Sequence, residues 1–485
     1  MIESILFLCL AIMKIKPIKK STRDLFKSLY MLGQQLNTPI YVVGGFVRDL
    51  WLGHENRDID FVILRDAISY ARAFKKKHHA SALVVYPKFG TAMVKLDPYK
   101  LEFVTAREES YIKSSRKPKV WKADLQTDLS RRDFTVNAMA MDISREKFGE
   151  IIDPWNGLTD LENRILRTPL DPDITFSDDP LRMLRAIRFA AQLSFEIEQH
   201  TYESIRRTAD RLKIISQERI TDEFNKIMLA PKPSVGLKLL YESNLLEIFL
   251  PELVQTIGTE QRSNFHHKDV FFHTLKVTDK VALLTEKLEL RLAALFHDIA
   301  KPRTKRFEEG TGWTFHGHEV VGERMAGAIL NRLKYPAQII HYVKKLVRLH
   351  LRPMSLVDEE VTDSAIRRLL FISGAEFDDL MILCRADITS KNLKTIKKHM
   401  QNYEIVLEKA RIVEEKDRIR AFKSPVDGIE IMHIFNLNPG PEVGRIKKII
   451  EDAILDGLVP NEHDAALSYL LKNRDKISYI PESHD

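Results

Sequence analysis

The spacing of hydrophobic positions divides the chain into a short first part with strand-like runs and a longer second part with helix-like spacing. Residues 46–52 predict a short helix, and Gly53 is well placed to end it. From about Asp179 onward, apolar residues recur three and four positions apart, which predicts helix for almost all of the remaining chain. Short apolar or alternating runs predict strands in the first part; they cover residues 40–43, 59–64, 82–85, 92–96 and 101–105. We therefore expect an α+β protein, with a small sheet-containing head followed by an all-helical body.

Composition fits a folded protein of several domains. The chain has 485 residues, of which 44% are hydrophobic and 29% charged, so wholesale disorder is excluded and one domain is too few. Cys9 and Cys384 cannot form a disulfide framework or a thiolate zinc site, so a reducing compartment is expected. The formal net charge of +7 is a modest excess that favours a polyanionic partner such as nucleic acid.

The apolar stretch at the start does not have the features of a membrane or secretion signal. Ile5 to Met13 is too short to span a bilayer, and Glu3 without a preceding basic residue is wrong for a secretory signal. The sequence from Met13 looks like an ordinary start, so residues 1–12 are expected to be a wrongly assigned upstream start or a tail. We expect a cytoplasmic protein without a membrane partner.

Two carboxylates and a double glycine in the head predict a site for magnesium and phosphate. Asp58 and Asp60 alternate along a strand, so both point from the same face of the sheet. Converging carboxylates are costly without a cation, and oxygen ligands suit Mg²⁺, which assists attack on phosphorus. Gly44 and Gly45 precede a helix, where backbone N–H groups approach phosphate, and Arg48 lies one turn further on. Each element alone is weak, because Asp-x-Asp is more often turn chemistry.

Three longer segments carry a pattern that includes these residues. They are Gly44–Gly53 with Arg57–Phe61, then Arg131–Ala140, then Asp178–Phe189. In order and spacing they resemble the signature motifs of class II tRNA nucleotidyltransferases and bacterial poly(A) polymerases, members of the DNA polymerase beta superfamily. The resemblance extends over about residues 20–475. It implies a polymerase-beta-like nucleotidyltransferase head with a mixed sheet, followed by a helical neck, body and tail.

The resemblance implies roles for individual residues. Asp58 and Asp60 are expected to be catalytic and to hold Mg²⁺, and Asp133 is expected to read the ribose hydroxyl. The nucleotide is expected to be bound by Gly44, Gly45, Arg48, Arg132, Asp133, Asp179, Arg182 and Arg185. Glu102 is either a third carboxylate near the metal or a solvent-facing strand residue, and both interpretations stay open.

Asp179 and Arg182 have a structural and a functional interpretation. An Asp before Pro180 is a normal helix N-cap, and Arg182 would then be an exposed helix residue. The resemblance implies instead that both residues form a protein template for the incoming base. Cytosine and adenine both present an amine donor beside a ring-nitrogen acceptor, which a carboxylate and a guanidinium match. Uracil and guanine reverse that pattern and are expected to be rejected.

Two basic segments are less specific. Residues 111–122 lie where the family has a mobile loop, and phosphate contact, gating and disorder are all open there. Residues 391–398 are basic as well. Either segment alone is most simply a solvated face or loop.

Histidines in the helical part predict a second metal site. His273 begins a helix, and the adjacent His297 and Asp298 lie on an apolar helix, where burying both is costly unless they bind something. Imidazole with carboxylate suits a divalent transition metal. This run resembles the HD-domain metal-dependent phosphohydrolases. The resemblance implies further ligands: Asp387, His318 and His350.

The tail, residues 428–462, resembles the C-terminal part of nucleotidyltransferases that carry an HD domain, which implies binding to the tRNA elbow. The predicted organisation is an N-terminal tail, a nucleotidyltransferase head, an RNA-binding helical neck and body, an HD domain and a tRNA-binding helical tail. These parts cover residues 1–20, 21–165, 166–260, 261–400 and 401–485.

The expected activity is that of a CCA-adding tRNA nucleotidyltransferase, which transfers CMP and AMP from CTP and ATP to a tRNA 3′ end and releases pyrophosphate. Mg²⁺ is the expected cofactor in the head, and a divalent transition metal is expected at the HD site. A poly(A) polymerase or an A-only adding enzyme is the alternative, because it shares every head motif. An alternative of another class is an HD-domain phosphohydrolase with an RNA-binding head.

Overall fold

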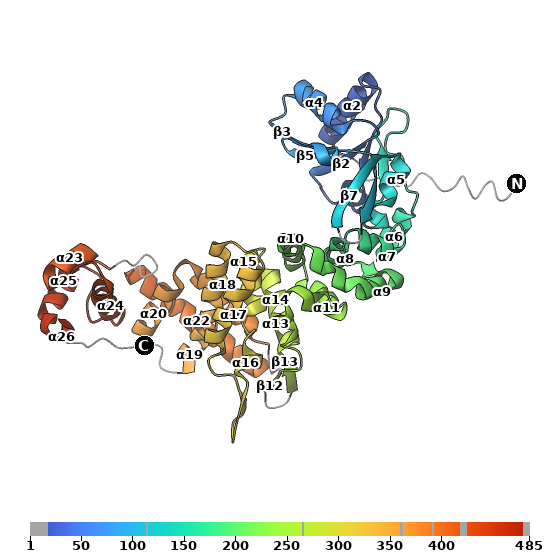
Figure 1. Cartoon of the computed structure of the whole chain (residues 1–485). Helices are drawn as coiled ribbons and strands as arrows, with labels where there is room; N and C mark the ends of the chain where they lie inside the picture. The colour runs from blue at the N-terminus through green and yellow to red at the C-terminus, as the bar shows by residue number, and fades with distance from the viewer. Residues whose placement is uncertain are drawn as a thin grey trace. The chain divides into compact units, whose positions relative to one another are not determined.

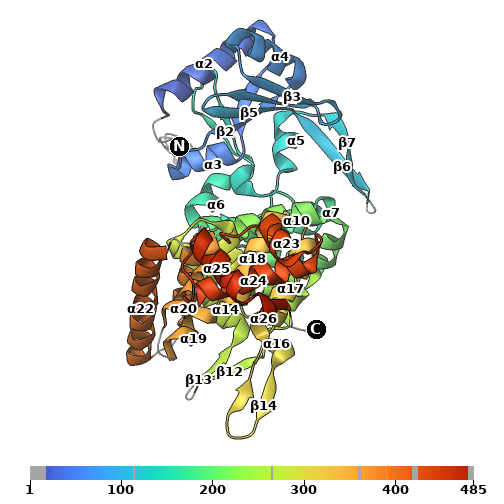
Figure 2. The same ribbon diagram turned by 90° about the vertical axis from the view of Figure 1, so that its left-hand side faces the viewer.

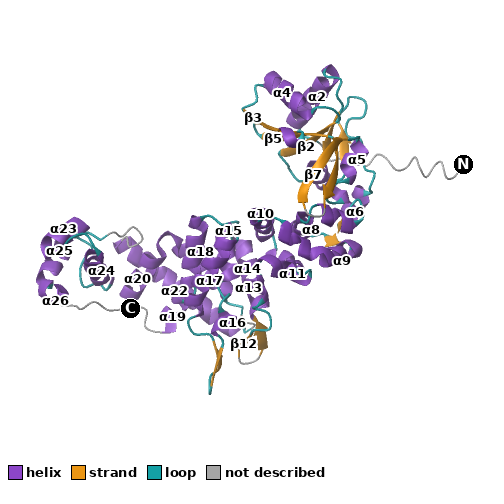
Figure 3. Cartoon of the chain, viewed as in Figure 1, coloured by secondary structure: helices purple, strands orange, loops and turns teal. Residues whose placement is uncertain are grey.

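The structure is a computed structural model that describes residues 18–112, 115–263, 266–358, 362–389, 392–417 and 424–478. The chain forms two compact units, which we describe separately. The first comprises Met1–Ala230 and Val235–Phe249, and the second comprises Pro231–Ser234 and Leu250–Asp485. The large sheet belongs to the first unit, whereas helices dominate the second (Figure 3). Within the described ranges, no helix is long and apolar enough to span a membrane.

The head contains a seven-stranded sheet in the order β3-β4-β5-β2-β1-β8-β9. β2 and β5 pair in parallel and the other neighbours are antiparallel, so the sheet is mixed, as predicted. Every strand predicted from the hydrophobic pattern is present, with small shifts at the ends. The strands are β1 Ile40–Val43, β2 Asp58–Ile63, β3 Ala82–Tyr86, β4 Thr91–Leu96, β5 Tyr99–Thr105, β8 Ala140–Asp142 and β9 Ile151–Ile152.

Helices cover the two faces of this sheet unequally. α2 (Lys20–Gln35) and α4 (Ala67–His78) lie on one face (Figure 1). The core beneath them is aromatic, and Phe26 meets Phe61 edge-on with ring centroids 6.0 Å apart. The short helix α5 (Leu125–Ser130) contributes to a small apolar cluster on the other face, formed with β1 and β2. That second face also carries the polar side chains of β2 and β5.

The predicted short helix after β1 is present as α3 (Gly45–Leu52). Gly44 enters it with a φ of +73°, and Gly53 ends it in the left-handed conformation with a φ of +76°. Both angles strongly favour glycine, since a side chain is strained there. The turn from β1 into α3 is thus specified by its glycines.

The predicted loop over residues 111–122 is instead part of a β-ribbon. β6 (Arg107–Ile112) pairs antiparallel with β7 (Ser115–Lys122). The loop interpretation is wrong for the described backbone, because the two strands satisfy each other's hydrogen bonds. The basic side chains at 113–119, for which phosphate contact, gating and disorder were left open, lie outside the described side chains.

The chain continues from the head into a series of helices. Arg188 and Glu223 join two of them in a buried ion pair, with Nη1 and Oε2 3.0 Å apart. The elements are α6 Gly157–Asn163, β10 Ile165–Leu166, α7 Pro172–Asp178, α8 Leu181–Leu193, β11 Glu196–Ile197, α9 Gln199–Thr208, α10 Gln217–Met228, α11 Pro233–Glu242 and α12 Leu245–Phe249. Short 3₁₀ helices occur at Pro87–Phe89, Thr135–Asn137, Ala209–Ile214 and Gly374–Glu376.

The second unit is helical apart from two short hairpins. The helices are α13 Pro251–Val254, α14 Val270–Leu284, α15 Leu288–Phe296, α16 Lys301–Thr304, α17 His318–Arg332, α18 Ala337–Leu349, α19 Arg352–Asp358, α20 Asp363–Ser373, α21 Phe377–Asp387, α22 Leu393–Asp417, α23 Gly428–Phe435, α24 Pro441–Leu455, α25 His463–Lys472 and α26 Arg474–Ser478. The hairpins pair β12 (Glu260–Ser263) with β13 (His266–Asp269) and β14 (Arg306–Glu308) with β15 (Gly312–Thr314). The hydrophobic pattern did not predict either hairpin. The α+β architecture as a whole is confirmed.

The last helices, α23 to α26, pack around a core of their own. Ile431, Ile450 and Leu470 are buried in it. On α20, Arg368 donates to Asp452 at 2.8 Å and thereby links this core to the preceding helices of the same unit.

Candidate functional site

Three carboxylates lie together on one face of the head sheet. Asp58 and Asp60 belong to β2, and parallel pairing places Glu102 of β5 directly beside Asp60. Side chains alternate along a strand, so these three share the face opposite to Phe61 and the aromatic core. Asp58 is exposed, while Asp60 and Glu102 are half-buried. The structure brings the two predicted carboxylates together with the one whose role was left open.

The surroundings of these carboxylates fit a divalent cation. Burial raises the pKa of Asp60, and the negative charge of Asp58 raises it further, whereas the positive charge of Arg132 lowers it by less than burial raises it. Burial likewise raises the pKa of Glu102, with a further contribution from Asp60. The carboxylates thus repel one another in a partly dry environment, and a cation between them relieves that cost. A set of oxygen donors is what Mg²⁺ prefers.

Gly44 lets the backbone approach Arg132 and the carboxylates closely. A Cβ atom at this position would lie 2.9 Å from Arg132 Nη1 and 3.5 Å from Asp60 Oδ2. Arg132 is held from behind by the fully buried Asp128, whose Oδ2 accepts from Nη2 at 3.2 Å. In the part of the chain that the structure describes, the buried Nε of Arg132 has no hydrogen-bond partner. A buried unpaired donor fits an anionic ligand.

A network of hydrogen bonds connects several other predicted residues. Arg48 Nη1 donates to Asn137 Oδ1 at 2.7 Å, and Asn137 Nδ2 donates to Asp133 Oδ1 at 3.0 Å. Arg185 donates to Asp133 Oδ2 through Nε at 2.8 Å and through Nη2 at 2.5 Å. Burial opposes the charge on Asp133, but Arg185 and Asn137 outweigh it and lower the pKa to about 2. Asp133 is therefore ionised and orients Arg185 and Asn137.

Asp179 and Arg182 lie where α7 gives way to α8. Asp179 Oδ1 accepts from the backbone N–H of Leu181 at 3.2 Å, which is a capping contact. Its other oxygen accepts from Arg219 at 3.1 Å. Arg182 is half-buried, not exposed, and Nη2 donates to the carbonyl oxygen of Arg131 at 2.6 Å. Capping therefore uses only one carboxylate oxygen, and Arg182 is tied to the second motif.

The predicted HD ligands come together at the ends of helices. His273 lies in the first turn of α14, His297 and Asp298 directly follow α15, His318 is the first residue of α17, His350 directly follows α18, and Asp387 is the last residue of α21. The histidine–aspartate pair thus follows a helix, which corrects the prediction that it lies within one.

One half of this cluster gathers on Asp298 Oδ2. His297 Nε2 lies 3.2 Å from that oxygen and His273 Nε2 lies 3.4 Å from it. Asp387 Oδ1 completes the group at 2.9 Å from His273 Nε2 and 3.4 Å from His297 Nε2. Donors this close and this buried converge on one point, as metal ligands do.

The other half gathers on the second oxygen of the same aspartate. Asp298 Oδ1 is 3.4 Å from His318 Nε2 and 3.9 Å from His350 Nε2, and the two imidazoles are 3.3 Å apart. Burial lowers the pKa of His350 to about 3, so this imidazole is neutral. In the tautomer that has its proton on Nδ1, the Nε2 atom has a free lone pair. The two oxygens of Asp298 thus face two different pairs of histidines.

Hydrogen bonds behind the rings fix their orientation. The Nδ1 atoms of His297, His318 and His350 lie 2.8, 2.7 and 2.7 Å from backbone carbonyl oxygens three residues earlier. His273 Nδ1 lies 2.9 Å from the hydroxyl of Thr389. Partners on Nδ1 direct Nε2 toward the cluster, which is the usual arrangement behind metal-binding histidines.

Several supporting residues were not predicted. Asp128 holds Arg132, Asn137 joins Arg48 to Asp133, and Arg219 holds Asp179. Asp128 had a sequence signal, since it lies three and four residues before two arginines, the spacing at which charges pair on a helical turn. Arg219 had none, because its contact with Asp179 depends on the packing of α8 against α10.

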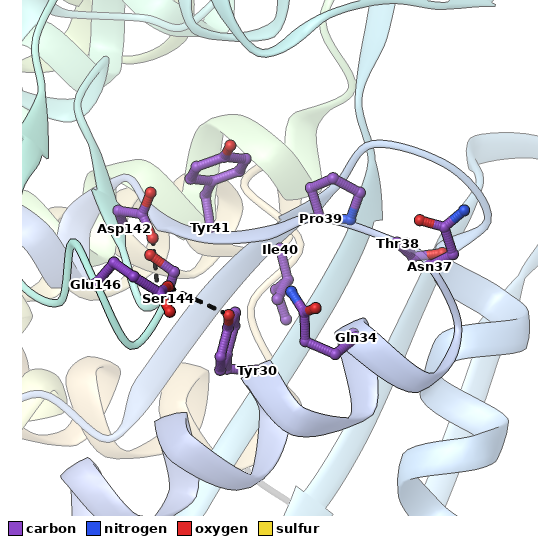
Figure 4. Close-up of a pocket in the computed structure, with 11 residues that line it drawn as sticks. Tyr30, Gln34, Asn37, Thr38, Pro39, Ile40, Tyr41, Asp142, Ser144 and Glu146 are labelled. Atoms are coloured by element: carbon purple, nitrogen blue, oxygen red, sulfur yellow. Dashed lines mark hydrogen bonds between the residues drawn. The ribbon is translucent and has the colours of Figure 1, made fainter.

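A separate cavity of about 310 Å³ lies at another edge of the head (Figure 4). It is lined by Tyr30, Gly33, Gln34, Asn37, Thr38, Pro39, Ile40, Tyr41, Asp142, Ser144 and Glu146. None of the predicted site residues is among these, so this cavity is not the site described above.

Comparison with known proteins decides the family. Family models match three successive stretches: the "Poly A polymerase head domain" at residues 40–167, the "Probable RNA and SrmB- binding site of polymerase A" at 194–256 and the "HD domain" at 270–420. The CC-adding tRNA nucleotidyltransferase of Thermus thermophilus is 32% identical over 88% of this chain and 92% of its own length. The chain belongs to the tRNA nucleotidyltransferase family.

Other members of this family are equally similar. The A-adding tRNA nucleotidyltransferase of Deinococcus radiodurans is 33% identical over 87% of this chain and 93% of its own length. The solved structure of the Bacillus stearothermophilus CCA-adding enzyme in complex with CTP aligns with a TM-score of 0.66 at 23% identity, covering 96% of this chain and 100% of that one. This likeness shows that the same fold extends through 96% of the chain.

Proposed function

We propose that this tRNA nucleotidyltransferase adds CMP and AMP from CTP and ATP to the 3′ end of tRNA and releases pyrophosphate. The observation that carries the proposal is the carboxylate face of β2 and β5 beside Arg132, whose guanidinium lies close to Gly44. A cation site next to an anion site is what nucleotidyl transfer requires. The long, nearly complete match to tRNA-specific relatives supports tRNA as the acceptor.

In the proposed mechanism, the terminal 3′ oxygen of tRNA attacks the α-phosphorus of the nucleotide. A new P–O bond forms, the bond to the pyrophosphate oxygen breaks, and the hydroxyl proton passes to solvent. Asp58 and Asp60 would hold Mg²⁺, with Glu102 beside them, and the bound metal would neutralise charge on the phosphate oxygens. Gly44 and Arg132 receive the triphosphate.

The remaining residues position the nucleotide. Hydrogen bonds run from Arg48 through Asn137 and Asp133 to Arg185. We therefore assign Asp133 a positioning role along with the predicted ribose contact. Asp179 and Arg182 select the base. Gly45 contributes its backbone N–H at the start of α3, where the helix dipole favours phosphate.

The number and kind of nucleotides added needs a direct test, since relatives of similar identity are CC-adding and A-adding. Three tRNA primers, lacking CCA, ending in C or ending in CC, are each incubated with one radiolabelled nucleotide at a time. Addition of CMP to the first two and AMP to the third supports CCA addition. AMP alone on the third indicates an A-adding enzyme, and long A tracts on an oligo(A) primer indicate a poly(A) polymerase.

We further propose that the HD cluster holds one or two divalent transition-metal ions and hydrolyses a phosphate ester. The gathering of His273 and His297 at one oxygen of Asp298, and of His318 and His350 at the other, supports this second function. Metal content of the purified chain, before and after chelation, tests the first half. Loss of phosphate release on chelation tests the second.

The division of labour follows the predicted parts. We propose that residues 21–165 catalyse transfer, that 166–260 and 401–485 bind tRNA, and that 261–400 form the HD site, with the cytoplasm as the place of action. Nuclease footprinting of bound tRNA against variants in each part tests this assignment.

A further inference from the structure

The hairpin formed by β14 and β15 is inserted between two of the proposed HD ligands. The chain runs from Asp298 through α16 into β14, turns, and returns through β15 to His318. The hairpin projects from the helices of its unit (Figure 2). Trp313 precedes His318 by five residues, a path of at most about 18 Å in an extended chain. Whatever binds to the base of this hairpin is therefore close to the metal cluster.

Two aromatic rings form a surface on the hairpin. Phe307 and Trp313 are direct cross-strand partners, so both point from the same face. Their ring centroids are 5.3 Å apart, with an interplanar angle of 76°. Phe307 is 62% exposed and Trp313 is 40% exposed. A pair that only stabilised the hairpin would have no need for this much exposed ring surface so close to a metal cluster.

Cations accompany the rings from the hairpin to the metal cluster. Lys305 Nζ lies 4.4 Å from the centroid of Trp313. Lys301 Nζ lies 5.7 Å from the centroid of Phe315 and 2.7 Å from Asp298 Oδ2. Aromatic faces combined with lysines are the features that bind unpaired nucleotides, because bases stack on the rings and phosphates pair with the cations.

We propose that Phe307 and Trp313 form a stacking platform for an unpaired nucleobase of RNA, and that this platform delivers an RNA phosphate ester to the HD site. The proposal rests on the second function proposed above. It specifies RNA as the substrate of that hydrolysis, rather than a small phosphate ester without a base. Phe307 and Trp313 are substrate-positioning residues in this scheme, while the metal ligands carry out the reaction.

Photocrosslinking tests the platform separately from hydrolysis. The full chain is irradiated with a single-stranded RNA hexamer carrying 4-thiouridine near its 3′ end, and crosslinked peptides are mapped by mass spectrometry. We expect crosslinks in residues 301–317, and a loss of roughly tenfold or more in the Phe307→Leu, Trp313→Leu double variant, which keeps apolar bulk without ring faces. Crosslinks to the head serve as the internal reference and should not change.

Matched variants keep the result interpretable. Phe307→Tyr with Trp313→Phe retains ring faces and should retain the crosslinks. Leu283→Ala with Leu284→Ala removes two other exposed apolar side chains of the same unit and should have no effect. Absence of hairpin crosslinks in the unmodified chain, or crosslinks that persist in the leucine variant, would overturn the platform.

Hydrolysis then links the platform to the metal site. With Mn²⁺ as the probe metal, phosphate release is compared for the hexamer bearing a 3′-phosphate and for glycerol 2-phosphate, which has no ring. The leucine variant should lose roughly ten- to a hundredfold in kcat/KM for RNA and remain unchanged for the ringless ester. Equal losses for both esters would contradict a stacking role. If neither ester is hydrolysed by any variant, the proposed HD activity fails while the crosslinking result still decides the platform.

Discussion

The side chains of Asp60 and Glu102 show how a metal site depends on strand register. Each carboxylate is half-buried, and burial together with a negative neighbour raises the pKa of both. Two such groups side by side oppose folding unless a cation or a proton joins them. The placement of both carboxylates on one face of the sheet supports a metal-binding role on physical grounds, independent of any similarity to other proteins.

Substitution of the carboxylates separates their roles. We expect Asp60→Ala to abolish CMP and AMP addition while leaving the affinity for tRNA within about twofold, because the carboxylate serves the metal and not the RNA. Glu102→Gln should retain some activity with a higher Mg²⁺ requirement, by roughly ten- to a hundredfold. Nucleotide addition measured across a Mg²⁺ titration checks both, with the exposed Glu150→Gln as control. Near-normal addition by Asp60→Ala would end the metal assignment.

The carboxylate of Asp179 has a capping contact and a proposed contact with the base. If it reads the base, Asp179→Ala should raise misincorporation of UTP and GTP by roughly ten- to a hundredfold relative to correct addition, the equivalent of about 1–3 kcal/mol. Capping alone predicts about 1 kcal/mol less stability with unchanged selectivity. Single-nucleotide incorporation for all four NTPs, measured beside a melting curve, distinguishes these outcomes.

At the scale of single residues, the sequence predicts only those arrangements that depend on neighbouring positions in the chain. The shared face of Asp58 and Asp60 could be predicted because alternation along one strand decides it. The place of Glu102 could not, because it depends on the parallel pairing of β2 with β5, a contact between separate parts of the chain. The same holds for Arg219, whose role beside Asp179 becomes visible only when two helices pack.

The turn from β1 into α3 shows how an element prepares a binding site. Gly44 has a φ of +73° with ψ of −141°, a combination that is essentially reserved for glycine, and its missing side chain faces Arg132. Gly53 at the other end of α3 has an ordinary left-handed conformation. One glycine therefore serves both backbone and ligand, whereas the other serves only the backbone.

Alanine at each of these glycines gives a matched comparison. Gly53→Ala should cost about 1–2 kcal/mol of stability and leave nucleotide addition largely intact. Gly44→Ala should cost a similar amount or more and also weaken the binding of CTP and ATP, since the new methyl group displaces Arg132. Melting temperature and nucleotide KM, determined for both variants, test the comparison. Equal KM values would show that the close approach of Gly44 to Arg132 does not serve nucleotide binding.

The hairpins mark the limit of pattern-based prediction at this scale. β14 and β15 have three residues each, too few for an alternating pattern to be visible. The turn signal was nevertheless present in Gly310 and Gly312 between Phe307 and Trp313. The end of α3 was predictable from a single residue, Gly53. The position of His297 after the end of α15 was not predictable, because the helical spacing of apolar residues continues across that end.

At the scale of the whole molecule, the two proposed sites belong to different compact units. The carboxylates of the head lie in the first unit, and the ligands around Asp298 lie in the second. Each site is built from contacts within its own unit, so each has its own source of stability. The two proposed chemistries, one forming and one breaking phosphate esters, are thus assigned to separate units of one chain.

This separation predicts that the activities can be removed one at a time. His297→Ala deletes a ligand that lies 3.2 Å from Asp298 Oδ2 and should abolish metal-dependent phosphate release, with fewer transition-metal ions bound per chain. CMP and AMP addition should stay within about twofold of the unmodified chain, because no ligand of the head is altered. Metal analysis, phosphate release and tRNA extension on the same preparation provide the measurement, with Asp58→Ala as the reciprocal variant. Chelation-sensitive hydrolysis that survives His297→Ala would exclude the cluster as its source, and a parallel loss of nucleotide addition would show that the two units depend on each other.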